Sequence, residues 1–187
     1  MSKPRVLIPL GRGVEELEAV ACIDVLRRAG CHVVTASVGG SNPIIGRNRI
    51  RILADIDITD ALAEWGDQWD LVLLPGGVGG VEAMESDAAL MQLLTERVAS
   101  GGLTAAICAA PRLLAAAGLN TDVPITGHPA CAKDLKAYAN YSKEAVVTGK
   151  HTITSRGAGT AVEFALACAA RLVGADVAAK VRVEIVG

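Results

Sequence analysis

The fold is decided by residues 6–38, which read VLIPL at 6–10, GRG at 11–13, a longer mixed segment at 14–31 and HVVTASV at 32–38. Two apolar runs of strand length are therefore separated by a segment of helix length. The uninterrupted apolar run at 6–10 is typical of a strand that is covered on both faces, as strands of parallel sheets are. The order strand, helix, strand predicts two parallel strands joined by a helix.

The helix in this unit is predicted over residues 15–29, and Gly30 is its expected stop. Three carboxylates, Glu15, Glu16 and Glu18, open it, where negative charge complements the helix dipole. We expect Glu15 and Glu16 on the solvent side and Glu18 on the inner side. The apolar positions expected along one buried face are Leu17, Val20, Ala21 and Val25.

The same alternation continues to the end of the chain. Further strands are predicted at 71–74, 103–107, 146–147 and 152–154, and further helices at 87–99, 110–117, 160–173 and 176–183. Residues 49–53 alternate with period two and predict a half-exposed strand off the main sheet. Thr59 is the expected cap of a short helix that ends at Trp65. The chain is thus expected to be one α/β domain over residues 1–187, with a mostly parallel central sheet and helices on both faces.

Composition excludes several classes of protein. The chain has 187 residues, a formal net charge of −2 and only 3% aromatic residues, which argues against binding of nucleic acid. Apolar runs fall short of the ~20 residues that span a membrane. The five cysteines are odd in number and contain no CxxC pair, which favours reduced thiols and a cytoplasmic location over a disulfide framework or a zinc site.

The segment LTAAICAAP at 103–111 is the strongest chemical signal in the chain. A predicted strand leads directly into Cys108, and Pro111 lies in the first turn of the helix that follows. Small neighbours on a strand-to-helix turn are typical of a nucleophile elbow, which exposes the reactive side chain at the carboxyl edge of the sheet. The amides at the helix N-terminus would favour a thiolate. A buried structural cysteine is the alternative.

Two further segments are expected to meet Cys108. The strand at 71–74 ends in Pro75-Gly76-Gly77, and neighbouring strand ends open onto one crevice. The backbone amides of Gly77 and Ala109 could then face the sulfur as an oxyanion hole, although a glycine turn has a purely conformational explanation too. Glu18, if it points inward, reaches the same crevice with a raised pKa and can shuttle a proton.

Other candidates are weaker. His128 lies in a loop after a short predicted strand, and a histidine near a cysteine suggests nucleophile activation only if the two residues meet in space. None of the three glycine-rich stretches, at 11–13, 76–80 and 157–159, matches a complete phosphate-binding pattern. A nucleotide-binding module with a flavodoxin-like fold is therefore disfavoured.

Several co-linear motifs resemble the ThiJ/PfpI family, and within it the branch of the parkinsonism-associated protein DJ-one and its bacterial relatives. The resemblance runs nearly end to end. Its motifs are GVEELE at 13–18, DVLRRAG at 24–30, LLPGG at 73–77, AAICAAP at 105–111, HP at 128–129 and TSRGAGT at 154–160.

The resemblance implies a flavodoxin-like three-layer sandwich that forms a homodimer and needs neither cofactor nor metal. It implies that Cys108 is the reactive cysteine, Glu18 its protonated partner and His128 the nearby histidine, with Gly77 and Ala109 supplying amides. The implied activity is a glyoxalase or deglycase that acts on small α-oxoaldehydes such as methylglyoxal or on glycated side chains and gives hydroxy acids.

The alternative function is an oxidative-stress sensor or redox-regulated chaperone that uses oxidation of the same Cys108. The chain departs from the family pattern in three places, and one of them is Ala158 in the late loop, where a proline is frequent. Ala109 stands where the protease-like branches have histidine, so peptidase activity is not expected. Asn48 stands where the branch often has arginine, and Arg47 is shifted by one position, which affects the expected dimer edge.

Overall fold

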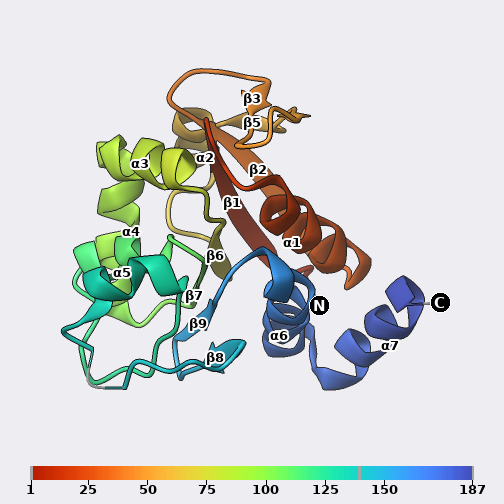
Figure 1. The fold of residues 1–187 in the computed structure, drawn as a ribbon. Helices are drawn as coiled ribbons and strands as arrows, with labels where there is room; N and C mark the ends of the chain where they lie inside the picture. The colour runs from red at the N-terminus through yellow and green to blue at the C-terminus, as the bar shows by residue number, and fades with distance from the viewer. Residues whose placement is uncertain (1, 139, 187) are drawn as a thin grey trace.

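The chain folds around one seven-stranded sheet in the order β5-β2-β1-β6-β7-β9-β8 (Figure 1). A computed structural model describes residues 2–138 and 140–186. Every neighbouring pair in the sheet is parallel except β8 and β9, which are antiparallel. The strands of this sheet are β1 (Arg5–Gly11), β2 (His32–Val38), β5 (Ile56–Asp57), β6 (Leu71–Leu74), β7 (Thr104–Ile107), β8 (Val146–Thr148) and β9 (Thr152–Ser155).

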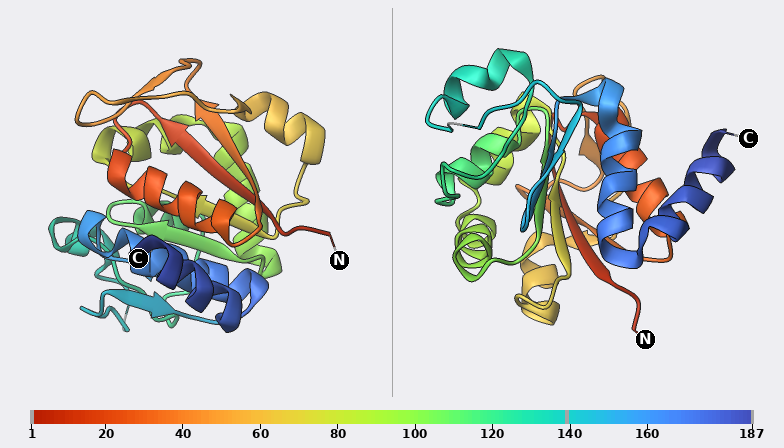
Figure 2. Two further views of the ribbon diagram at one scale, coloured as in Figure 1. Left: turned by 90° about the vertical axis from the view of Figure 1, so that its right-hand side faces the viewer. Right: turned by 90° about the horizontal axis from the view of Figure 1, so that it is seen from below.

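Helices cover both faces of the sheet, as the edge-on view in Figure 2 shows. One face packs on α1 (Glu16–Arg28), α6 (Ala161–Val173) and α7 (Ala175–Val186). The other face packs on α2 (Ile58–Trp65), α3 (Val78–Ser86), α4 (Ala88–Ser100) and α5 (Pro111–Ala116). The prediction of a flavodoxin-like three-layer sandwich is confirmed. None of the described helices has the length and hydropathy required to cross a membrane.

The prediction for the faces of α1 was right for Glu18 and Val25, which are buried, and wrong for Leu17, Val20 and Glu16. Leu17 and Val20 are 58% and 49% exposed, whereas Glu16 and Glu18 are buried. Glu16 is buried because it accepts hydrogen bonds from the backbone N–H groups of Asn48 and Ile50, at 2.6 and 3.3 Å. Two carboxylates of α1 are thus buried, against different neighbours, and part of its exposed surface is apolar.

Several boundaries differ from the sequence predictions. Asp57, not Thr59, caps α2, because its carboxylate accepts the N–H of Thr59. Residues 78–86 form helix α3, which the glycine-rich sequence did not suggest. The predicted short strand before His128 is only an isolated bridge between Ile125 and Tyr141, and a 3₁₀ helix, η1 (Pro129–Leu135), follows the histidine. A second 3₁₀ turn, η2 (Ala158–Thr160), precedes α6.

An arm, residues 42–55, projects from the sheet between β2 and β5. It contains a separate two-stranded sheet of β3 (Ile44–Ile45) and β4 (Arg51–Ile52), so the predicted strand at 49–53 is shorter than expected. The strand does not extend back to Arg49 because this residue lies in a turn with φ 67°.

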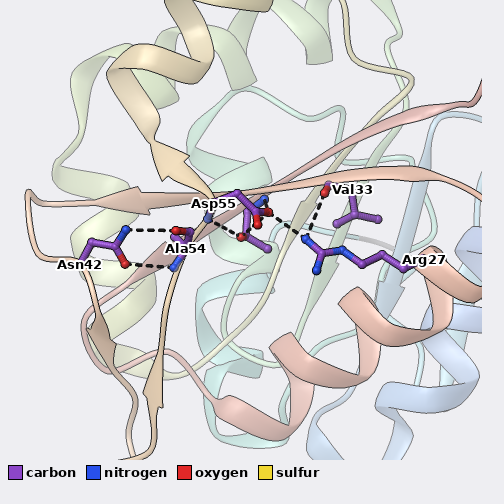
Figure 3. A network of polar contacts seen from close by, with 6 residues as sticks. Arg27, Val33, Asn42, Ala54 and Asp55 are labelled. Atoms are coloured by element: carbon purple, nitrogen blue, oxygen red, sulfur yellow. Dashed lines mark hydrogen bonds and ion pairs between the residues drawn. The ribbon is translucent and has the colours of Figure 1, made fainter.

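The base of the arm is held by a hydrogen-bond network that Figure 3 shows. The side-chain amide of Asn42 pairs with both the N–H and the carbonyl of Ala54, at 3.0 and 3.1 Å. Asp55 Oδ2 accepts from the N–H and hydroxyl of Thr35 in β2 and from the guanidinium of Arg27 in α1, at 2.7–2.9 Å. Asp55 therefore joins the arm, the sheet and α1.

Replacing Asp55 by alanine is expected to lower the free energy of unfolding by about 1–3 kcal/mol, because the N–H and hydroxyl of buried Thr35 lose their acceptor. Urea denaturation at pH 7 measures the difference. Glu96→Ala is the control: Glu96 accepts a hydrogen bond from Gln92 on the exposed surface of α4, and its loss should cost about 0.5 kcal/mol or less. Equal effects of the two variants would contradict a structural role for the network.

Candidate active site

Cys108 occupies a strained turn between β7 and α5. Its φ is +66°, in the left-handed region that residues with a side chain rarely adopt. Backbone hydrogen bonds hold it on both sides: its N–H donates to the carbonyl of Ser155 at 2.9 Å, and its carbonyl accepts the N–H of His128 at 2.8 Å. This is the nucleophile-elbow geometry that the sequence predicted. The residue is 9% exposed, so most of its surface is covered by the surrounding protein.

Glu18 reaches the same place from the first turn of α1. Its carboxyl is fully buried, and Oε2 accepts the N–H of Gly76 at 2.8 Å. Glu15 makes this approach possible because its own carboxylate caps α1 by accepting the N–H of Glu18 at 2.9 Å. Burial raises the pKa of Glu18 to about 7, against the smaller lowering effects of the Gly76 N–H and the Cys108 thiol.

Cys108 Sγ faces the backbone N–H groups of Gly77 and Ala109, both of which lower the pKa of the thiol. Burial, together with the charge of an ionised Glu18, opposes them and raises the pKa of Cys108 to about 12. Burial therefore works against the thiolate that the sequence predicted from the helix N-terminus. Glu18 and Cys108 are not ionised together near neutral pH, and the pair retains at least one proton.

The surrounding donors favour leaving that proton on Glu18. The sulfur has two backbone amides, whereas the carboxylate has the N–H of Gly76 alone at Oε2. Apart from the thiol itself, no group among the described residues donates to the buried Oε1. An unpaired buried carboxylate oxygen is costly, but a protonated Oε1 needs no donor and can donate to Sγ. The arrangement favours a carboxylic acid beside a thiolate over a carboxylate beside a thiol.

His128 lies at the mouth of the site and is exposed. Its Nδ1 accepts the N–H of Ala130 at 3.2 Å, so the neutral ring carries its proton on Nε2. A Cβ at Gly157 would lie 3.5 Å from His128 Cδ2, the ring atom next to Nε2. The backbone hydrogen bond to Cys108 thus brings His128 close to Cys108 and Glu18, although among the described residues no hydrogen bond joins its imidazole ring to the side chain of either one.

Gly76 is required by the close approach of the reactive pair. A Cβ there would lie 2.6 Å from both the Cβ of Cys108 and Oε2 of Glu18, closer than real contacts allow. Gly77 adopts φ +85°, which leaves its N–H facing the sulfur. The sequence identified Gly77 as an amide donor but assigned no separate role to Gly76, because steric exclusion by a partner distant in sequence leaves no local signal.

Other features of the surface lie away from these residues. A cavity of about 500 Å³ is found near the starts of β7 and β9, at the opposite end of the sheet, and Val98, Ala117, Leu119 and His151 are among its lining residues. None of the five predicted site residues lines it. Within residues 2–138 and 140–186 there is no cluster of three or more His, Cys, Asp or Glu side chains suited to a metal ion.

Comparison with known proteins agrees with this geometry. Residues 4–171 match the model of the DJ-1/PfpI family. The chain is 37% identical to the Parkinson disease protein 7 homolog of Danio rerio, over 100% of the chain and 98% of the relative. It is 32% identical to the glutathione-independent glyoxalase DJR-1.2 of Caenorhabditis elegans, over 91% and 89%. The crystal structure of Drosophila melanogaster DJ-1beta superposes with a TM-score of 0.91 at 36% identity, over 99% of this chain and 98% of that one.

The proton shared by Glu18 and Cys108 predicts the pH dependence of alkylation. Both groups are protonated at low pH, and the first proton is expected to leave near the pKa of about 7. If the remaining proton stays on Glu18, the pKa that governs the reaction of Cys108 with iodoacetamide lies below the roughly 8.5 of a free cysteine. Peptide mass mapping across pH 5–10 follows each cysteine separately.

Cys131 serves as the internal reference, because it is partly exposed and burial raises its pKa above the ordinary value. Its midpoint should lie above that of Cys108. A Cys108 midpoint above pH 9 would instead show that Glu18 keeps the charge and the sulfur keeps the proton.

Proposed function

The chain belongs to the DJ-1/PfpI family, and on that premise we propose that it converts small α-oxoaldehydes such as methylglyoxal, or their adducts on protein side chains, into hydroxy acids without glutathione. The observation that carries the proposal is the buried pair of Glu18 and Cys108, with the amides of Gly77 and Ala109 at the sulfur. One relative of the chain is named a glutathione-independent glyoxalase, which supports the same activity.

The reaction begins when Cys108 Sγ adds to the aldehyde carbon of methylglyoxal. The S–C bond forms as the carbonyl π pair moves to oxygen, and the protonated Glu18 supplies the proton that gives a neutral hemithioacetal. The amides of Gly77 and Ala109 stabilise the charge that develops during addition.

A proton then moves from the former aldehyde carbon to the adjacent carbon. Glu18, now a carboxylate, removes the C–H proton of the former aldehyde carbon, and that electron pair forms a C=C bond as the ketone π pair moves to its oxygen. The hydroxyl proton of the hemithioacetal moves to this oxygen, and Glu18 returns its proton to the neighbouring carbon, giving a thioester of lactate. A pKa of about 7 suits both directions of this transfer near neutral pH. We expect Nε2–H of His128 to hydrogen-bond to the ketone oxygen, since Nδ1 already accepts the N–H of Ala130. Water cleaves the thioester, which releases lactate and restores the thiol.

Incubation of the purified protein with methylglyoxal alone is expected to yield lactate in an enzymatic assay. Cys108→Ser should abolish this yield because the nucleophile is lost, and Glu18→Gln should lower the rate by about 10²- to 10⁴-fold because the proton transfer is lost. Cys131→Ser, which removes a cysteine outside the pair, should keep full activity.

Lactate production that survives in Cys108→Ser would contradict the mechanism. A folded wild-type protein that makes no lactate would contradict the activity. The second result would favour the alternative in which oxidation of Cys108 is the signal of a redox sensor or chaperone.

We further propose that the protein is a homodimer that buries the outer face of α1 and the arm. Val20, Ile23, Ile52 and Leu53 line one cavity between these two elements. Leu17, Val20, Ile50 and Leu53 are each about half exposed or more, which is unusual for so many large apolar side chains on neighbouring elements. A second copy of the same face would cover them, as an isologous interface does.

Val20→Glu is expected to convert the dimer to a monomer, because it places a charge in the apolar contact. Light scattering coupled to size-exclusion chromatography measures the mass. Val183→Glu is the matched control, since Val183 is 69% exposed on α7, outside the proposed contact. A wild-type mass of one chain would contradict the proposal, as would an equal loss of mass in both variants.

A further inference from the structure

Residues 155–160, which we call the strap, connect β9 to α6 and pass close to Cys108. The carbonyl of Ser155 accepts the N–H of Cys108, so the strap and the nucleophile are tied together at 2.9 Å. Gly157 follows with an extended backbone, φ 160° and ψ −170°, and is itself buried. The strap therefore lies directly against Cys108.

The position of Gly157 relative to the reactive atoms is specific. A Cβ built on this glycine would lie 3.9 Å from Cys108 Sγ, 3.9 Å from Glu18 Oε1 and 3.5 Å from His128 Cδ2. All three are ordinary van der Waals distances, and the extended backbone is open to any residue. An alanine would fit here without distorting the protein, yet its methyl group would fill the space that all three side chains border.

That space is where the carbonyl compound must lie. A molecule that is attacked by Sγ and exchanges a proton with Glu18 has to contact both groups at once, with its remaining part toward His128. We propose that the missing side chain of Gly157 sets the size of the carbonyl compound that Cys108 accepts, a specificity-determining role that rests on the function proposed above.

Thr160 holds Gly157 in this position. Its Oγ1 accepts the N–H of Gly157 at 3.3 Å and lies 2.8 Å from the carbonyl oxygen of the same glycine. The Thr160 backbone N–H donates to that carbonyl at 2.8 Å.

The Thr160 hydroxyl is in turn fixed by the end of β9. It lies 2.6 Å from the hydroxyl of Ser155, which donates to the carbonyl of Ala145 at 2.7 Å. Ser155 is fully buried, so this chain anchors the strap to the sheet rather than to solvent. Thr160 is therefore a positioning residue that acts through Gly157.

The first experiment compares Gly157→Ala with Gly159→Ala. The second variant is a matched control on the same strap, because a Cβ at Gly159 meets no atom within 4 Å. Gly157→Ala is expected to lower kcat/KM for phenylglyoxal by roughly 10- to 100-fold and to affect glyoxal, the smallest dicarbonyl, much less. Gly159→Ala should leave both values unchanged. Thermal unfolding checks that both variants remain folded.

A readout that does not depend on turnover keeps this test separate from the proposed function. The rates at which iodoacetamide and the bulkier N-ethylmaleimide alkylate Cys108 are measured by peptide mass mapping. Gly157→Ala should slow the bulky reagent more than the small one, whether or not the protein converts aldehydes. An unchanged ratio of the two rates, or the same change in Gly159→Ala, would overturn the assignment of Gly157.

Thr160 is tested with the same two reagents, and the expected change has the opposite sign. Thr160→Val removes the hydroxyl that fixes Gly157, so the strap can move away from Cys108. The rate of alkylation by N-ethylmaleimide is then expected to rise relative to the rate of alkylation by iodoacetamide. Thr160→Ser keeps the hydroxyl and should restore the wild-type ratio. Identical ratios in the valine and serine variants would exclude the positioning role of Thr160 while leaving the test of Gly157 intact.

Discussion

The site depends on one buried interaction, in which Glu18 Oε2 accepts the N–H of Gly76 while the rest of the carboxyl lies beside Cys108. This contact brings the first turn of α1 against the end of β6, and the absence of a side chain at Gly76 allows Cys108 to complete the group. Burial of the carboxyl raises its pKa to about 7, so a group that is normally ionised becomes able to hold a proton at neutral pH. The chemistry that we propose follows from this raised pKa of Glu18.

The three carboxylates at the start of α1 have three different partners. Glu15 lies just before the first helical residue, and Glu16 and Glu18 point in different directions because successive helical positions are about 100° apart. Glu15 caps the N-terminus of α1. Glu16 accepts hydrogen bonds from the arm at Asn48 and Ile50; although burial raises its pKa, its own backbone N–H and the N–H groups of the arm leave that pKa below its usual value. Glu18 enters the site. The turn that supplies the acid therefore also fixes the arm, which links the geometry at Cys108 to the face proposed for the second subunit.

The sequence was sufficient to predict the layers of the fold and the position of Cys108 on a turn between a strand and a helix. Continuous apolar strands alternating with helices leave few topologies open, and a cysteine between a strand and a proline-started helix has a characteristic local pattern. The inner and outer faces of α1 could not be predicted in this way. Leu17 and Val20 have the apolar character of core residues, but tertiary hydrogen bonds draw Glu16 inward and leave those two outside. Helix α3 was missed because its glycines, at 79 and 80, suit a loop by propensity. Both are packed against residues 12–14, so tertiary contact outweighs propensity there.

The strain at Cys108 explains why so many contacts converge on it. A cysteine with φ +66° costs free energy in the folded state and persists only where neighbouring structure fixes both of its peptide groups. Ser155 holds the N–H and His128 the carbonyl, so the residues that stabilise the strained backbone come from two separate segments that lie against Cys108. A shift of either segment changes the direction of the sulfur as well as its surroundings. The orientation of the thiol and its contact with these two segments are thus set by the same hydrogen bonds, so a residue that is only 9% exposed keeps its sulfur in one direction.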